Sequence, residues 1–286
     1  MSEDASAYYR DLYASEDDAR RAGWRHRLEQ ALRYEVAIRL LGESAMARTS
    51  LLDIGCGPGG LLCYLEDTGR TPGTYLGIDP LEDAVSRARE RSPSGHFERR
   101  ALEDFDAHSG FDAVVAIGAL VDGVGVASHR MRRQRIAAFF ERLIATGASR
   151  GVLIVLEQGA LDMRTSLAAE DALFGLYTHE VDVFLSSFSA RYASLSFAAH
   201  AGFLQTDLAI CWHPATEGAS AGGDLGTISL NAVIGGPWAE DVEPSWLAWL
   251  CLEAGEIERA SGFLVGARES PRVALLRERI ALLSKS

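Results

Sequence analysis

Short apolar runs alternate with stretches of helical spacing through the middle of the chain. Runs that predict strands stand at 51–54, 74–79, 96–99, 111–117 and 151–158. Between them, apolar residues recur every three or four positions, which predicts helices at 60–66, 82–91 and 128–146. Strands that alternate with helices at this spacing form a parallel sheet with helices on both faces. The pattern therefore predicts an α/β fold with three layers.

Helical patterns flank this core on both sides. Residues 1–48 predict a helical lead-in, and residues 238–286 predict a helical extension. The central domain then spans 49–237. Within it, residues 159–203 are too long for a plain crossover between two strands and predict an inserted element. Two further strands are predicted near the end of the domain, at 202–212 and 227–234.

The composition is that of a soluble globular protein. The 286 residues are 48% hydrophobic and 24% charged, which suits one α/β domain with modest additions. The net charge of −12 argues against binding to nucleic acid or to an anionic membrane, since both require basic surface. The first residues are acidic and carry no apolar leader, which favours a cytoplasmic location.

No arrangement of side chains predicts a metal site. The four cysteines are scattered, at Cys56, Cys63, Cys211 and Cys251, and are expected to be reduced thiols. The Asp, Glu and His residues show no spacing typical of zinc or magnesium ligands. We therefore expect an activity that requires no metal.

The stretch from Ser50 to Leu62 carries the most specific chemistry. An apolar run ends in Asp53, and the turn that follows contains Gly55, Gly57, Gly59 and Gly60. Glycines let a backbone turn sharply and approach a ligand, and the next helix directs free N–H groups at it. The spacing fits both a dinucleotide fingerprint and a G-x-G-x-G turn. Asp53 favours the second, because a carboxylate there repels a pyrophosphate and tolerates a cationic sulfonium.

From Leu52 to Gly59 the chain resembles the first motif of class I S-adenosylmethionine (SAM) methyltransferases, and the resemblance extends over about residues 20–235. It implies a Rossmann-like sandwich whose seven-stranded sheet ends in an antiparallel strand. The strands at 202–212 and 227–234 would then form a hairpin at the sheet edge. It also implies SAM as the cofactor and S-adenosylhomocysteine (SAH) as the product.

The predicted cofactor site joins the glycine turn to the ends of later strands. Asp79 lies about nineteen residues beyond the turn, where an acidic side chain accepts hydrogen bonds from ribose hydroxyls. By the resemblance, the Leu102 amide and the Glu103 side chain meet the adenine, although Ala101 stands where an acidic residue is frequent. The full predicted set is Asp53, Gly55, Cys56, Gly57, Gly59, Asp79, Pro80, Leu102, Glu103, Gly118 and Arg33.

Arg33 enters this set by resemblance alone. In similar methyltransferases an arginine of the lead-in binds the SAM carboxylate, and Arg25 is the other candidate here. A solvated side chain is the competing interpretation of Arg33 and of Glu103. The remaining elements are expected on one rim, because ligands of open α/β sheets bind outside the carboxyl ends of the strands, near the reversal in strand order.

The acceptor side of the site is less specific. Glu157, at the carboxyl end of the 151–158 run, and His179, in the insert, are the candidate general bases. A structural histidine is the competing interpretation of His179, and His213 is a further candidate base. The candidate substrate-binding residues are Tyr9, Tyr13, Trp24, Asp122 and Tyr177.

We predict methyl transfer to an O or N nucleophile of a small molecule or short peptide, because the aromatic lead-in and long insert suit such a substrate. An arginine-rich composition with a single lysine is typical of GC-rich genomes, and analogy suggests natural-product tailoring. Two alternatives stay open. One is a SAM-binding assembly or regulatory protein without catalysis, and the other is an NAD-dependent oxidoreductase. A homodimer through the C-terminal helices is a further hypothesis, with contacts from Trp246, Trp249, Phe263 and Leu276.

Overall fold

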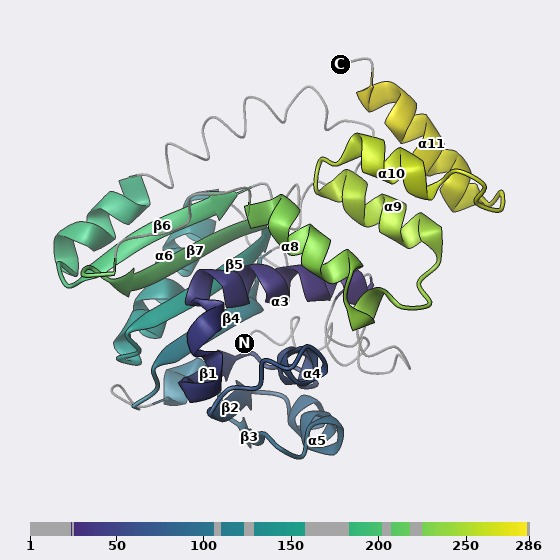
Figure 1. Ribbon diagram of the computed structural model, residues 1–286. Helices are drawn as coiled ribbons and strands as arrows, with labels where there is room; N and C mark the ends of the chain where they lie inside the picture. The colour runs from purple at the N-terminus through teal and green to yellow at the C-terminus, as the bar shows by residue number, and fades with distance from the viewer. Residues whose placement is uncertain are drawn as a thin grey trace.

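A mixed β-sheet forms the centre of the molecule (Figure 1). The computed structural model describes residues 24, 26–105, 110–122, 129–157, 183–201, 207–217 and 225–284. These residues form seven strands: β1 Ser50–Ile54, β2 Thr74–Asp79, β3 His96–Arg99, β4 Ala113–Asp122, β5 Arg150–Glu157, β6 Leu195–Ala201 and β7 Asp207–Pro214.

The strands lie in the order β3-β2-β1-β4-β5-β7-β6. Strands β1 to β5 pair in parallel, and β7 runs antiparallel to both of its neighbours, β5 and β6. The α/β fold with a mostly parallel sheet and an antiparallel final strand is therefore confirmed.

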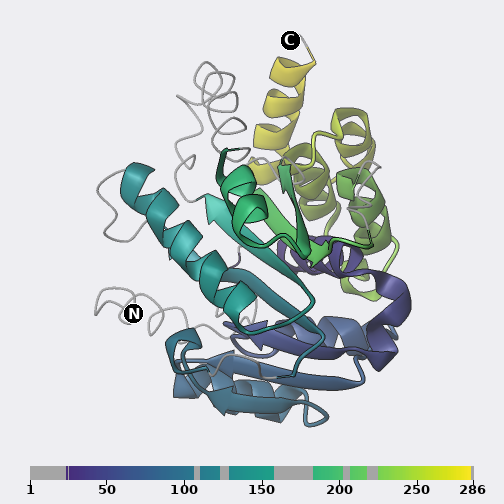
Figure 2. The same ribbon diagram turned by 90° about the vertical axis from the view of Figure 1, so that its left-hand side faces the viewer.

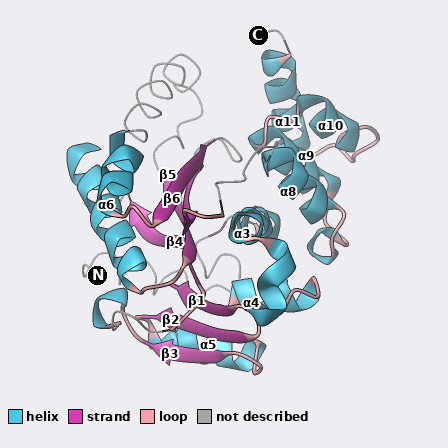
Figure 3. Cartoon of the chain, turned by 60° about the vertical axis from the view of Figure 1, so that its left-hand side comes forward, coloured by secondary structure: helices cyan, strands magenta, loops and turns pink. Residues whose placement is uncertain are grey.

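Helices cover both faces of this sheet. The described α-helices are α3 Arg27–Leu41, α4 Gly60–Asp67, α5 Glu82–Arg91, α6 His129–Ala145, α8 Leu225–Ile234, α9 Pro244–Glu253, α10 Ile257–Phe263 and α11 Pro271–Leu283. Residues 183–191 are also helical, and short 3₁₀ turns stand at η1 Glu43–Arg48, η2 Leu102–Asp104 and η3 Pro237–Ala239. Figure 3 shows α6 on one side of the sheet and α3 and α4 on the other. The predicted three layers are present.

The side chains of each strand alternate between two cores. In β1, Leu51 joins the core under α3 and α4, whereas Leu52 joins the core under α6. The parallel strands read as continuous apolar runs because both of their faces are covered. Gly151 interrupts the run of large apolar residues in β5. A Cβ at this position would lie 2.2 Å from the ring of Trp212, its partner in β7, so a larger side chain has no space.

Helix α3 is buried on nearly every side. Only Arg27 and Arg39 of its residues are not fully buried, although the helix carries charged residues along its whole length. It packs against β4 and β5 on one side and against α8 and α9 on the other. Buried charges destabilise a fold unless they are paired. The charged residues of α3 therefore require partners from other elements.

Arg33 of α3 has such partners in a buried triad. Its Nε lies 2.5 Å from Asp207 Oδ2 and its Nη2 lies 3.0 Å from Oδ1, so the contact is bidentate. Its Nη1 lies 3.0 Å from Glu29 Oε1. The guanidinium also stands 4.6 Å from the ring centre of Trp24. This triad connects α3 to the start of β7.

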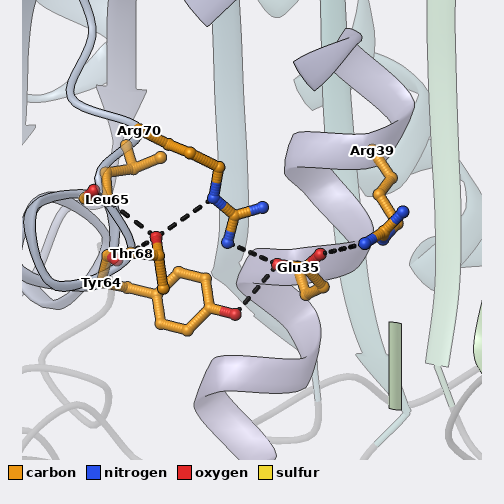
Figure 4. A network of polar contacts seen from close by, with 6 residues as sticks. All are labelled: Glu35, Arg39, Tyr64, Leu65, Thr68 and Arg70. Atoms are coloured by element: carbon orange, nitrogen blue, oxygen red, sulfur yellow. Dashed lines mark hydrogen bonds and ion pairs between the residues drawn. The ribbon is translucent and has the colours of Figure 1, made fainter. Parts of the chain in front are cut away.

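Glu35, two residues further along α3, has a second set of partners, shown in Figure 4. Its carboxylate accepts a hydrogen bond from the Tyr64 hydroxyl at 2.9 Å and ion pairs with Arg70 at 2.6 Å and Arg39 at 2.7 Å. Burial raises the pKa of Glu35, but the bonds from Arg70 and Tyr64 outweigh it and hold the pKa below its usual value. This network connects α3 to α4 and to Arg70, three residues beyond α4.

The prediction of a strand at 227–234 is wrong, because residues 225–234 form helix α8. The segment alternates polar and apolar residues, but Ser229, Leu230 and Val233 also share one helical face, which is buried. That face packs against α3. The antiparallel hairpin at the sheet edge does exist, but β6 and β7 form it. Strand β6 lies inside the segment predicted as an insert, of which 159–182 and 202–203 lie outside the described residues.

The C-terminal helices share a core with α3 and gather at one end of the molecule, away from β2 and β3 (Figure 2). Gly255 turns the chain between α9 and α10 with φ +79°. Trp246 of α9 stacks on His26 with ring centres 4.3 Å apart, and Leu276 of α11 is only 3% exposed. The homodimer stays a prediction.

In the described part of the chain, no helix has the length and hydropathy needed to cross a membrane.

Replacing Asp207 by alanine tests the buried triad. We expect D207A to lower the free energy of unfolding by about 3–5 kcal/mol, because Arg33 keeps its charge and loses its bidentate partner in the core. Urea unfolding measures the change. As a control, R33M/D207L removes both charges and should be clearly more stable than D207A. Equal stability of the two variants would contradict this role of the pair.

Candidate functional site

The carboxyl ends of β1, β2 and β4 meet where the strand order reverses. The chain runs from β1 to β2 and β3 on one side, and returns to β4 and β5 on the other side of β1. Loops diverge at such a point and leave room for a ligand outside the strand ends. The sequence-predicted cofactor residues other than Arg33 come from this edge of the sheet or from the turns beside it.

The glycine turn after β1 adopts a backbone that other residues rarely reach. Gly55, Gly57 and Gly59 have φ values of +71°, +52° and +77°. The amides of Gly55 and Cys56 donate to the Ile78 carbonyl at 2.8 and 3.1 Å, which ties the turn to β2. A Cβ on Gly55 would lie 2.6 Å from the Cβ of Ala119 in β4. The turn is therefore held between β2 and β4.

Strand β4 is irregular at this point. Its register against β5 shifts between Ile117 and Val121, and Gly118 has φ +69°. A glycine inside a strand pattern is a common sign of a bulge. The irregularity coincides with the close approach of Ala119 to Gly55. Gly118, predicted as a rim residue, thus lies where β4 approaches the glycine turn.

Helix α4 begins at the end of the glycine turn with no side chain capping it. Its first amides have no intrahelical partners. A Cβ on Gly60 would lie 2.4 Å from the Tyr34 hydroxyl and 2.8 Å from Gln30 Nε2, both from α3. Helix α3 therefore contacts the first residue of α4, and only glycine leaves space for that contact.

Asp79 is held at the end of β2 by two backbone amides. Its Oδ2 accepts from Gly57 N at 3.1 Å and its Oδ1 accepts from Leu81 N at 2.9 Å. Burial raises the pKa of this carboxyl to about 6, against the lowering effect of the two amides. Each oxygen keeps a second lone pair for a further donor. Asp79 thus both orders the glycine turn and presents a hydrogen-bond acceptor.

Asp53 is the more deeply buried carboxyl, with 2% of its surface exposed. Its Oδ2 accepts a 2.5 Å hydrogen bond from the Tyr75 hydroxyl. Burial raises the pKa of Asp53 to about 7; the bond from Tyr75 lowers it, and the nearby charge of Asp79 raises it. No group among the described residues donates to Oδ1. Sequence reasoning missed Tyr75, although its position opposite Leu51 in β2 places it on the same sheet face as Asp53.

The turn after β3 brings Leu102 to the same edge. The Arg100 amide donates to the Asp79 carbonyl at 3.0 Å, which ties this turn to the end of β2. Leu102 begins η2, and its own amide has no acceptor within the part of the chain that the structure describes. Glu103 is exposed beside it. The backbone N–H of Leu102 is therefore available to a ligand.

Other predicted site residues lie elsewhere or are only partly described. Arg33 is engaged by Asp207 and Glu29, and Trp24 is buried against it, so neither belongs to the rim. Pro80 follows β2 directly. Burial raises the pKa of the Cys56 thiol well above its usual value, which keeps it protonated. Outside the described residues lie Tyr9, Tyr13, Arg25, Tyr177 and His179.

Asp122 and Glu157 are register partners at the carboxyl ends of β4 and β5. These two candidates therefore stand side by side on neighbouring strands, at the same edge of the sheet as the glycine turn. Within the described ranges, no three His, Cys, Asp or Glu residues are grouped so as to hold a metal ion.

Residues 51–144 match the family model described as a methyltransferase domain. The matched segment runs from β1 into α6 and includes the glycine turn, Asp79, Leu102 and Gly118. The match confirms the resemblance inferred from the first motif. None of the curated proteins matches the sequence.

Solved structures of methyltransferases align with the chain at low identity. The plantazolicin methyltransferase BpumL in complex with SAH is 15% identical, with a TM-score of 0.48 over 74% of this chain and 90% of that one. A TehB-like SAM-dependent methyltransferase from Corynebacterium glutamicum is 18% identical, with a TM-score of 0.39 over 74% and 97%. A ribosomal protein L11 methylase from Lactobacillus delbrueckii subsp. bulgaricus is 11% identical, with a TM-score of 0.40 over 63% and 77%. Such values transfer no substrate or catalytic residue to this chain.

The raised pKa of Asp53 predicts a pH-dependent stability of the ligand-free protein. Between about pH 4 and pH 7 the folded state binds more protons than the unfolded state, so the free energy of unfolding falls as the pH rises. We expect D53N to exceed the wild type by about 1–3 kcal/mol at pH 8, because it buries no charge there, and by much less at pH 4. Urea unfolding at both pH values measures this.

Asp112 provides a control of opposite sign. Asp112 lies directly before β4, at the amino ends of the parallel strands. The amide and the hydroxyl of Ser50 donate hydrogen bonds to its carboxylate, and these bonds hold the pKa of Asp112 below its usual range. D112N should therefore lower stability at pH 8, where the carboxylate is charged, and lose this effect as the pH falls below 4. A D53N advantage of the same size at pH 4 and pH 8 would contradict the assignment of Asp53.

Proposed function

We propose that this chain, whose residues 51–144 match a methyltransferase domain, binds SAM and transfers its methyl group to an O or N nucleophile of a small molecule or short peptide. One observation carries the proposal. The glycine turn, Asp79, the Leu102 amide and Gly118 come from four separate segments and gather at the edge where the strand order reverses.

The residues of this edge fit the parts of SAM. The positive φ angles of Gly55, Gly57 and Gly59 leave no side chain between the turn and a ligand. The free lone pairs of Asp79 suit ribose hydroxyls, and the Leu102 N–H suits an acceptor on the adenine. The carboxyl of Asp53 suits the cationic end of the molecule. The same carboxyl disfavours a pyrophosphate and hence NAD.

SAM supplies a methyl group that its sulfonium already activates, so the protein must chiefly position the acceptor in line with it. We place the acceptor beside the carboxyl ends of β4 and β5, near Asp122 and Glu157. In this proposal Glu157 takes the proton of the nucleophile, and His179 is the second candidate base. Natural-product tailoring and a cytoplasmic location belong to the same proposal and are supported by composition alone.

Calorimetry with SAM, SAH and NAD in parallel tests the cofactor. We expect SAM and SAH to bind and NAD not to bind. Binding of NAD without SAM would overturn the proposal in favour of an oxidoreductase. Turnover of SAM to SAH with a panel of hydroxyl and amine acceptors then separates an enzyme from a SAM-binding protein without catalysis.

Replacing Asp79 by alanine tests the ribose contact. We expect D79A to weaken SAH binding by about 1–3 kcal/mol, or about 5- to 150-fold, because the acceptor of the ribose hydroxyls is lost. The control is D112A. The carboxylate of Asp112 also accepts a hydrogen bond from a backbone amide, that of Ser50 at 2.8 Å, but it lies at the amino ends of the strands, opposite the candidate site. D112A should bind SAH as the wild type does. Unchanged affinity in D79A would refute the ribose contact.

A further inference from the structure

Asp53 is bound within the described residues by one donor, the hydroxyl of Tyr75. That donor is rigid. The ring of Tyr75 is buried and meets Phe97 of β3 edge to face, with ring centres 5.6 Å apart. Phe97 and Cys56 also pack tightly against Gly77, which follows Tyr75 by two residues in β2: a Cβ on Gly77 would lie 2.7 Å from Phe97 and 2.9 Å from Cys56. The core therefore determines where the Tyr75 hydroxyl points.

We propose that Tyr75 is a positioning residue of the cofactor site: its hydroxyl holds Asp53 Oδ2 and thereby presents Oδ1 to the α-ammonium group at the amino-acid end of SAM. This inference rests on the proposed function and goes beyond it, since it assigns the orientation of Asp53 to a residue outside the glycine motif. Tyr75 itself touches no ligand in this arrangement. It acts through the carboxyl group that it binds.

The surroundings of Asp53 supply no cation in contact with it, as far as the described residues extend. The ionisable groups that face it are Asp79 and Tyr75 from β2, Cys56 from the turn and Tyr34 from α3. Among the described residues, the cation whose charge acts on this group is Arg91 of α5, which lowers the pKa of Tyr34 and donates to the Pro58 carbonyl at 3.1 Å. Tyr75 is thus the group that stabilises the charged form of Asp53 by a hydrogen bond.

Loss of the hydroxyl has a consequence that depends on pH. Without its donor, the buried carboxyl beside Asp79 holds its proton to a higher pH, because burial and a like charge both disfavour ionisation. A neutral Asp53 attracts a cation less. The affinity for SAM should therefore fall most near neutral pH and recover at higher pH, where Asp53 ionises even without Tyr75.

The test compares Y75F with Y64F by calorimetry of SAM and SAH between pH 6 and pH 8.5. Tyr64 is the matched control, because its buried hydroxyl also donates to a buried carboxylate, Glu35, at 2.9 Å, and neither residue acts on the pKa of Asp53. We expect Y75F to bind SAM about 10-fold more weakly at pH 7 and its affinity profile to shift upward by about one pH unit. Y64F should lose stability but keep the affinity and the profile of the wild type.

The double variant D53N/Y75F completes a double-mutant cycle with the single variants D53N and Y75F. The amide introduced by D53N cannot ionise, so the Tyr75 substitution should change the affinity of D53N little and its pH profile not at all. If Y75F does not fold, D53N tests the carboxyl through which Tyr75 acts: its affinity must lose the step near pH 7 that Asp53 contributes, while the step near pH 6 from Asp79 remains. A step near pH 7 that persists in D53N overturns the proposal.

The failures of the two proposals are distinguishable. A wild type that binds neither SAM nor SAH overturns the proposed function. A wild type that binds both, with a Y75F variant of equal affinity and profile, overturns the role of Tyr75 alone. Equal losses in Y75F and Y64F indicate a general structural effect and also overturn it.

Discussion

The burial of helix α3 is the constraint on which the rest of the structure depends. A helix with charged residues on several faces is stable inside a protein only if other elements supply partners. Asp207 at the start of β7 and Arg70 beyond α4 supply them for Arg33 and Glu35. Arg150 of β5 adds a bond to the Leu41 carbonyl at the end of the helix. These contacts position the sheet, α4 and the antiparallel edge relative to one helix.

The same helix completes the candidate site. Tyr34 and Gln30 of α3 lie against Gly60 at the start of α4, so the helix that is buried in the core also contacts the end of the glycine turn. On this face the two buried carboxyls, Asp53 and Asp79, oppose the stability of the ligand-free fold, because burial raises both of their pKa values. Residues that reduce stability and serve a ligand are common in binding sites. The cost of burying the two carboxyls is consistent with such a role.

Elements with one clear period were predicted well, and the ambiguous one was not. The strands at 74–79 and 96–99 and the helix at 82–91 have the predicted bounds, because local spacing and Pro80 determine them. The segment 227–234 alternates as a strand does, yet it also carries a helical face that α3 covers. Its structure was decided by packing, and the edge strand came instead from 195–201, inside the predicted insert.

The sequence by itself determined the glycine turn, the acidic residues at the strand ends and the family to which this motif points, because these depend on neighbours a few residues away. Only the tertiary structure decided which groups the buried charges meet. Arg33 looked like a ligand for a carboxylate, and its partner is Asp207, 174 residues away in the chain. Tyr75 looked like an ordinary strand residue, and it is the donor to Asp53. No local pattern encodes such pairs, since they form where the packed layers bring distant side chains into the same low-dielectric core.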